Sequence, residues 1–182
     1  MGVSHDQVHS TRVVVLVGLM GSGKSSVGRR LAQTMRLDFY DTDEMVASAT
    51  KKSVRELFAE GESVFRSHER DALVDALERA SKGSGVVATG GGVVTVPQNV
   101  ADIQRHASAV VWLDADVEEL VARTSSGTHR PLLDGGARGK LEEMHRERRS
   151  LYESLATLRV STKGRSIASI TELIATQLGS VA

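Results

Sequence analysis

The chain has 182 residues, which is enough for one well-filled α/β domain and short for two. Its 23 lysines and arginines balance 23 aspartates and glutamates, so net charge gives no argument for a nucleic acid or an anionic membrane as partner. The sequence has no cysteine, which excludes disulfide bonds and thiolate metal sites and fits a reducing compartment.

The N-terminus carries no recognisable targeting signal. Residues 1–11 lack the apolar core of a signal peptide, and Asp6 stands where a myristoylation motif needs serine or threonine. No later apolar run is long enough to span a membrane. We therefore expect a disordered leader at residues 1–11, a single domain over residues 12–182, and a soluble cytoplasmic protein.

A buried strand that leads into a phosphate-binding loop is predicted at residues 13–26. The apolar run VVVLV at 13–17 is followed by GLMGSGKSS, which matches the spacing GxxxxGK[ST]. In such a loop the glycines turn backbone N–H groups toward phosphate oxygens, Lys24 reaches the β/γ-phosphates, and the Ser25 hydroxyl faces Mg²⁺. A glycine-rich turn could match by chance, but apolar residues at helical spacing from Val27 onward favour a nucleotide triphosphate site.

The remaining chain alternates between strand and helix patterns. Strands are expected at 37–40, 86–89, 109–113 and 158–161. Residues 44–80 have a helical pattern interrupted at Gly61, and further helices are expected after Pro97, at 117–123, at 140–156 and after Ser166. The stretch 124–139 has the composition of a mobile loop, and Trp112 is expected in the core rather than against a ligand.

This alternation predicts an α/β fold with a parallel sheet that is covered by helices on both faces. Ligands of such sheets gather over the carboxyl ends of the strands. We therefore expect the phosphate loop, Asp41, Asp43 and the triple glycine at 90–92 to meet at one edge. The triple glycine follows a strand directly, where it indicates that the backbone approaches another group closely.

Four charged residues are the first candidates for the chemistry. Asp41 and Asp43 end a strand and could support Mg²⁺, although an aspartate at that point could simply cap the next helix. Arg123 and Arg130 lie in or beside the expected loop, where they could compensate phosphate charge or could be ordinary solvated charges. The six histidines have no paired metal-ligand spacing.

Arg66 and Arg148 are on predicted helices, where a surface salt bridge is the default explanation for either residue alone. They become informative as part of a longer pattern. In order, the chain carries GLMGSGKS at 18–25, DTD at 41–43, GE at 61–62 with FR at 65–66 and Glu69, GGG at 90–92, RPLL at 130–133, and Arg148 ahead of LYE at 151–153.

With these motifs the chain closely resembles the shikimate kinase family, from Gly18 to about Arg165. The resemblance implies a P-loop, nucleoside-monophosphate-kinase-like three-layer sandwich with a five-stranded parallel sheet and a mobile lid at about residues 115–138. It implies phosphorylation of the 3-hydroxyl of shikimate by MgATP, with a shikimate-binding helical region at about residues 41–72. We also expect a monomer that binds no nucleic acid and no membrane.

The same resemblance assigns roles to individual residues. Ser25 would bind Mg²⁺ directly and Asp41 through water, while Lys24, Asp43 as base and Arg130 from the lid would be catalytic. ATP would contact Gly21, Ser22, Gly23, Lys24, Ser25, Ser26, Arg123, Arg130 and Arg165. Shikimate would contact Asp43, Arg66, Glu69, Gly90, Gly91, Gly92 and Arg148.

Within the acceptor site, Arg66, oriented by Glu69, and Arg148 would clamp the shikimate carboxylate, and N–H groups around Gly91 would hold ring hydroxyls. The chain departs from the family at Lys51, where glycine is common, and at Ser150, where proline is common. Two other functions stay open: a kinase for another small hydroxy acid such as gluconate, and a non-catalytic nucleotide-binding module.

Overall fold

A parallel sheet of five strands forms the centre of the protein in a computed structural model that describes residues 11–124 and 136–179. The elements follow one another as β1 Val13–Val17, α1 Lys24–Met35, β2 Asp38–Asp41, α2 Thr42–Thr50, α3 Val54–Glu60, α4 Glu62–Gly83, β3 Gly85–Ala88, the 3-10 helix η1 Val93–Thr95, α5 Pro97–His106, β4 Ala109–Asp114, α6 Val117–Thr124, α7 Ala137–Leu155, β5 Leu158–Ser161 and α8 Ile167–Gly179.

β1 is the central strand of the sheet, whose order is β2-β3-β1-β4-β5. All strand pairs are parallel, and Val14 of β1 lies opposite Val86 of β3 and Ala109 of β4. Every residue of β1 is buried, as expected for a strand that has neighbours on both edges and helices on both faces. The phosphate loop therefore begins at the end of a fully buried central strand.

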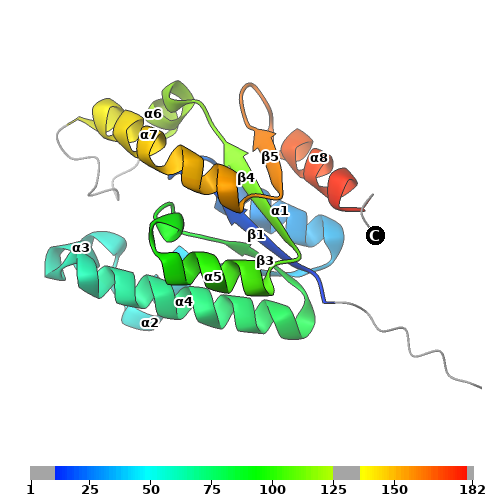
Figure 1. Cartoon of the computed structure of the whole chain (residues 1–182), viewed down its shortest axis with the longest axis horizontal. Helices are drawn as coiled ribbons and strands as arrows, with labels where there is room; N and C mark the ends of the chain where they lie inside the picture. The colour runs from blue at the N-terminus through cyan, green and yellow to red at the C-terminus, as the bar shows by residue number, and fades with distance from the viewer. Residues whose placement is uncertain (1–10, 125–135, 180–182) are drawn as a thin grey trace, which may run out of the picture.

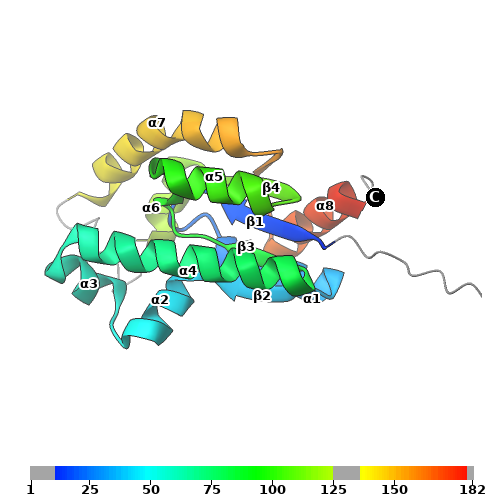
Figure 2. The ribbon, with the colours of Figure 1, turned by 60° about the horizontal axis from the view of Figure 1, so that its bottom comes forward.

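Helices cover both faces of the sheet (Figures 1 and 2). On one face α1 and α8 pack over Val14 and Leu16, and on the other α4, α5 and α7 pack over Val15 and Val17. A smaller cluster joins α2 and α3 to α4. The expected three-layer α/β sandwich with a five-stranded parallel sheet is confirmed, and Trp112 is in its core at 2% exposure.

The region predicted as helical over residues 44–80 consists of three helices instead of two. Besides the predicted break at Gly61, the chain turns after Lys51, which ends α2 in the left-handed conformation at φ 57°. Ser53 then starts α3: its side chain accepts the Glu56 N–H, and the Glu56 carboxylate accepts the Ser53 N–H at 2.7 Å. This capping box defines a helix start that the apolar pattern did not indicate.

The predicted boundary between the loop at 124–139 and the next helix is wrong by about three residues, because α7 begins at Ala137 and not at about Lys140. Arg138 stabilises this first turn: its Nε lies 3.0 Å from Oε1 of Glu142, one helical turn later. Residues 125–135, which include Arg130 and the middle of the expected lid, lie outside the described residues.

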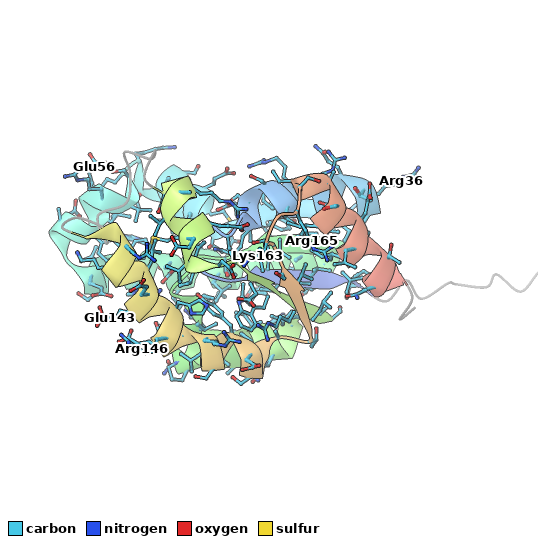
Figure 3. The ribbon with its side chains drawn as sticks, turned by 90° about the horizontal axis from the view of Figure 1, so that it is seen from above. Arg36, Glu56, Glu143, Arg146, Lys163 and Arg165 are labelled. Atoms are coloured by element: carbon cyan, nitrogen blue, oxygen red, sulfur yellow. The ribbon has the colours of Figure 1, made fainter. Side chains whose placement is uncertain are left out.

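The outer surface carries many charged side chains, and Figure 3 shows Arg36, Glu56 and Glu143 extending away from the body of the molecule. Several of them form exposed ion pairs, such as Arg79 with Asp75 at 2.8 Å. Across residues 11–124 and 136–179, no helix is long and apolar enough to cross a membrane.

Candidate active site

The phosphate loop wraps around the N-terminus of α1. Gly18, Gly21 and Gly23 adopt φ values of 143°, 79° and 97°, which side chains with a Cβ rarely tolerate. Lys24 Nζ donates to the carbonyl oxygens of Gly18 and Leu19, each at 2.8 Å. The first N–H groups of α1 and its dipole face the same loop, which makes it an anion-binding site.

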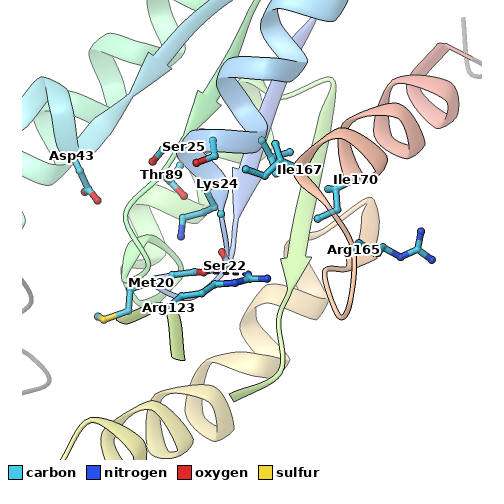
Figure 4. A pocket seen from close by; sticks show the side chains of 14 residues that line it. Met20, Ser22, Lys24, Ser25, Asp43, Thr89, Arg123, Arg165, Ile167 and Ile170 are labelled. Carbon is cyan, nitrogen blue, oxygen red and sulfur yellow. Dashed lines mark hydrogen bonds between the residues drawn. The ribbon is translucent and has the colours of Figure 1, made fainter. Parts of the chain in front are cut away.

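A cavity of about 520 Å³ opens beside this loop (Figure 4). Asp43 and Thr89 lie on one side of it, and Arg165, Ile167 and Ile170 lie on the other. The remaining lining comes from Arg123 and from the loop and first turn of α1: Met20, Gly21, Ser22, Gly23, Lys24, Ser25, Ser26 and Val27. The sheet edge therefore gathers the predicted phosphate-binding residues and one of the two strand-end carboxylates around a single space.

Asp41 caps α2. Its Oδ1 accepts the N–H groups of Asp43 at 3.0 Å and Glu44 at 3.3 Å, so the capping alternative considered for these aspartates applies to Asp41. Its other oxygen, Oδ2, accepts no hydrogen bond from a described residue. The cap turns Asp43 into the first turn of α2, where its carboxylate faces the cavity.

Asp43 has an unusual protonation equilibrium. Its side chain is accessible from the cavity but is closely surrounded by protein atoms, and this desolvation raises its pKa to about 6. The neighbouring Asp41 carboxylate raises the pKa further, whereas the ammonium group of Lys24 opposes the rise. A carboxylate with a pKa near 6 can accept a proton from a reacting hydroxyl at neutral pH.

The triple glycine that follows β3 packs tightly against α4. A Cβ at Gly90 would overlap the buried Glu69 carboxylate, and a Cβ at Gly92 would overlap the Arg66 guanidinium. Glu69 Oε2 in turn accepts a hydrogen bond from Arg66 Nη1 at 2.7 Å. The close approach predicted for these glycines is therefore made, at both positions, to protein side chains.

α7 brings two side chains to the middle glycine. The carbonyl oxygen of Gly91 accepts Nη1 of Arg148 at 3.1 Å and the hydroxyl of Tyr152 at 2.5 Å. The Nε group of Arg148 is buried without a hydrogen-bond partner among the described residues. Arg66 and Arg148 thus flank consecutive residues of one loop, although they come from helices that are distant in the sequence.

Thr42 and Tyr152 hold this loop from opposite sides, and neither was assigned a role from the sequence. The buried Thr42 hydroxyl accepts the N–H of Gly90 at 3.1 Å and so joins the end of β2 to the loop. Thr42 is the middle residue of the DTD motif and Tyr152 is the middle residue of the LYE motif. These positions were the only indication in the sequence that the two residues belong near the site.

Two further predicted arginines, Arg123 and Arg165, line the cavity. Arg123 Nη1 lies 3.4 Å from the Gly21 carbonyl oxygen, and its Nη2 donates to Glu119 at 3.1 Å. Glu119 also accepts the N–H of Gly164 at 2.9 Å, which connects α6 to the segment after β5. Arg165 lines the cavity, but its guanidinium points away from Lys24 (Figure 4). Arg130 is outside the described residues.

The fold and the site together define a P-loop kinase of the nucleoside-monophosphate-kinase-like class. Three features lie together at one edge of the sheet: the phosphate loop, the Asp43 carboxylate with its raised pKa, and the glycine loop that Arg66 and Arg148 flank. The sequence model of the family described as shikimate kinase matches residues 20–178. The chain belongs to the shikimate kinase family.

Individual relatives agree with this membership. The shikimate kinase of Thermobifida fusca is 40% identical over 170 residues, which cover 93% of this chain and 96% of the relative. The solved structure of a shikimate kinase from Acinetobacter baumannii in complex with shikimate is 31% identical, covers 94% of each chain and superposes with a TM-score of 0.89. A gluconokinase from Sinorhizobium meliloti, at 20% identity over 95% of this chain and 94% of its own, superposes with a TM-score of 0.66 and shares the fold alone.

Proposed function

We propose that this protein transfers the γ-phosphoryl group of ATP to the 3-hydroxyl of shikimate. The product would be shikimate 3-phosphate, a step of chorismate and aromatic amino-acid biosynthesis. The observation that carries the proposal is the placement of Arg66 and Arg148 on either side of one glycine loop, next to a carboxylate with a raised pKa. Two guanidinium groups are suited to a substrate that carries a carboxylate.

The phosphate loop would bind ATP through the N–H groups of residues 21–26 and through Lys24. Lys24 Nζ donates to two carbonyl oxygens of the same loop, so its ammonium group is already held at the place where the phosphates would bind. Arg123, 3.4 Å from the Gly21 carbonyl oxygen, and Arg165 on the opposite wall would border the adenine side, and Arg130 would approach the phosphates from the lid.

Mg²⁺ would be held by the Ser25 hydroxyl directly and by Asp41 through water. The residues present fit this ion, because both offer hard oxygen donors and Asp41 Oδ2 is not used in capping α2. When bound, Mg²⁺ neutralises part of the negative charge on the β- and γ-phosphates.

Asp43 would act as the general base. Its carboxylate would take the proton of the 3-hydroxyl as that oxygen forms a bond to the γ-phosphorus, and the bond to the β-phosphate oxygen would break to release ADP. Below a pH of about 6 the carboxyl is protonated and cannot perform this step.

Arg66 and Arg148 would bind the shikimate carboxylate. The hydrogen bond from Arg66 to the buried Glu69 fixes the orientation of one guanidinium, and the unpartnered Nε of Arg148 leaves a donor for an anionic group. The N–H groups of Gly91 and Gly92 make no hydrogen bond with any described residue, so they are available for ring hydroxyls.

The proposal extends to the organisation of the chain. Residues 12–182 would form one kinase domain after a leader at 1–11, with the lid at about 115–138 and the shikimate-binding region at about 41–72. The enzyme would act as a monomer in the cytoplasm, where ATP is available as co-substrate.

The test is a steady-state assay of ADP formation with MgATP and a panel of acceptors that includes shikimate and gluconate. We expect shikimate to have the highest kcat/KM of the panel, and shikimate 3-phosphate to be identified as the product by mass spectrometry. A preference for gluconate would overturn the acceptor assignment. ATP binding without turnover of any acceptor would favour a non-catalytic nucleotide-binding module.

A further inference from the structure

Tyr152 is the most enclosed aromatic residue near the acceptor site. It lies on α7 with 1% of its surface exposed, and its ring stacks on Trp112 with 5.9 Å between the ring centroids. Its hydroxyl donates to the carbonyl oxygen of Gly91 at 2.5 Å. The ring is thus held by packing, and the hydroxyl makes a specific polar contact with the glycine loop.

The hydroxyl of Tyr152 remains a hydrogen-bond donor throughout the working pH range of the enzyme. Burial raises its pKa well above the ordinary value, and the charge of the nearby Arg148 opposes this rise only in part. The Gly91 carbonyl oxygen therefore accepts from two donors, the neutral hydroxyl of Tyr152 and the charged guanidinium of Arg148.

The direction of the Gly91 carbonyl sets the direction of the following N–H. In a planar trans peptide the C=O of Gly91 and the N–H of Gly92 point in opposite directions. With the carbonyl held toward α7, the Gly92 N–H faces away from α7. The Thr42 hydroxyl holds the preceding turn by accepting the Gly90 N–H at 3.1 Å. The N–H groups of Gly91 and Gly92, which make no hydrogen bond with any described residue, follow this contact directly.

We infer that Tyr152 is a positioning residue for the acceptor site. Its hydroxyl fixes the carbonyl of the Gly91–Gly92 peptide, and this peptide in turn holds the Arg148 guanidinium and directs the Gly92 N–H. Tyr152 itself touches neither substrate. The inference rests on the proposed function, because it assigns the acceptor to this loop.

The direct test is Tyr152→Phe, which keeps the ring and its stacking on Trp112 but removes the hydroxyl. Loss of one buried hydrogen bond corresponds to about a threefold to tenfold change in binding, so the KM for shikimate should rise by about that factor. The KM for ATP and kcat should each stay within about twofold of the wild type, because the phosphate loop and Asp43 are not contacted by Tyr152.

Tyr40→Phe is the matched control. The Tyr40 hydroxyl lies 3.5 Å from Asp38 at the start of β2 and makes no contact with the glycine loop, so its removal should leave both KM values unchanged. Thermal unfolding of both variants separates a folding defect from a positioning defect. A purely structural role of Tyr152 would lower Tm and kcat without a selective rise in the shikimate KM.

A double-mutant cycle tests the route of the effect. In an Arg148→Ala background, Tyr152→Phe should raise the shikimate KM by a smaller factor than in the wild type, since one of the two groups that Tyr152 helps to hold is gone. Three outcomes would overturn the inference: full additivity of the two changes, an unchanged shikimate KM in Tyr152→Phe, or an equal rise in the ATP KM. None of these outcomes contradicts the proposed function as long as the wild-type enzyme phosphorylates shikimate. A wild-type protein that does not use shikimate would overturn the proposed function and the inference with it.

Discussion

Glu69 Oε2 lies 2.7 Å from Arg66 Nη1, and the Glu69 side chain is buried beneath the glycine loop. A buried carboxylate is costly without a partner, and the guanidinium supplies one. The pair fixes the plane of the Arg66 guanidinium and also occupies the space in which a side chain at Gly90 or Gly92 would lie.

We predict that Arg66→Lys and Arg148→Lys each raise the shikimate KM by about tenfold to a hundredfold. Lysine keeps the charge but loses the planar pair of donors that matches a carboxylate. The ATP KM should change much less, and Arg130→Lys should show the opposite bias. Arg79→Lys, on an exposed face of α4, is the control and should change neither KM. Equal loss of ATP and shikimate affinity would contradict the acceptor assignment.

A methyl group added to the glycine loop should damage acceptor binding without contact with any ligand. Gly90→Ala would force its Cβ into the Glu69 carboxylate, which is buried and cannot move away freely. We expect the shikimate KM to rise by at least about tenfold, at the scale of a lost charged hydrogen bond. The matched control is Gly139→Ala in α7, where nothing lies within 4 Å of the added Cβ. This control should preserve both KM values.

Asp43→Asn should lower kcat by about a hundredfold or more, the usual scale for a positioned base, with ATP affinity preserved. It should also stabilise the protein at neutral pH. The folded-state pKa of about 6 is above the ordinary value of 3.8, so the contribution of Asp43 to stability is fully present at low pH and is lost as pH rises through 6. The gain in Tm should therefore appear at pH 7.5 and vanish near pH 4. A variant that keeps most of its kcat would exclude Asp43 as the base.

The kcat/KM for shikimate at saturating MgATP should fall about tenfold per pH unit below pH 6, because protonated Asp43 cannot accept the hydroxyl proton. Asp41→Asn removes a negative charge that raises this pKa, so it should move the acidic limb to lower pH. The quantity to compare is the apparent pKa of the acidic limb in the plot of kcat/KM against pH, and not the maximum value of kcat/KM. A limb that stays in place would mean that another group titrates.

Lys24→Ala should weaken ATP binding, measured by calorimetry with and without Mg²⁺, by about tenfold to a hundredfold. The lysine contributes a charged donor inside the loop and is 8% exposed. Lys52→Ala, which removes an exposed lysine paired with Glu60, should leave ATP binding unchanged. Undiminished ATP binding and turnover in Lys24→Ala would remove the basis of the nucleotide assignment.

Lys51→Gly should stabilise the protein by about 0.5–1 kcal/mol, because a non-glycine residue in the left-handed region costs about 1–2 kcal/mol and the greater freedom of glycine in the unfolded chain offsets part of the gain. The corresponding rise in Tm is about 1–4 °C. The adjacent Lys52→Gly lacks this strain and removes an ion pair, so it should not stabilise. An unchanged or lower Tm in Lys51→Gly would show that the Lys51 conformation costs little.

The sequence predicted the central features of the fold because they depend on local patterns. The run at 13–17 is apolar throughout and forms the central strand, and the glycines of the phosphate loop have the positive φ values that the motif requires. Short-range signals that were available but unused account for one error. Ser53 and Glu56 have the spacing of a capping box, and this box starts α3 within the part before Gly61, which was predicted as one helix.

Contacts between distant segments could not be derived from local patterns. The Arg138 side chain at the start of α7 reaches Glu118 in α6, 20 positions away, and this pair supports a helix start in residues whose glycine content favoured a loop. Likewise, Tyr152 meets Gly91 only because α7 packs against η1, which directly follows the glycine loop, and the two residues are 61 positions apart. The motifs indicated which residues belong to the site, and the tertiary fold determines which of them touch.

The chain has a single tryptophan, and its position makes it a natural optical reporter. Trp112 is buried in β4, stacks on the Tyr152 ring and has the Arg159 guanidinium 4.8 Å from its ring centroid. Because indole emission responds to nearby charge and to the rigidity of its surroundings, rearrangement of the acceptor side would reach this fluorophore through Tyr152. Intrinsic fluorescence therefore offers a label-free signal whose origin is one residue, in direct contact with the Tyr152 ring.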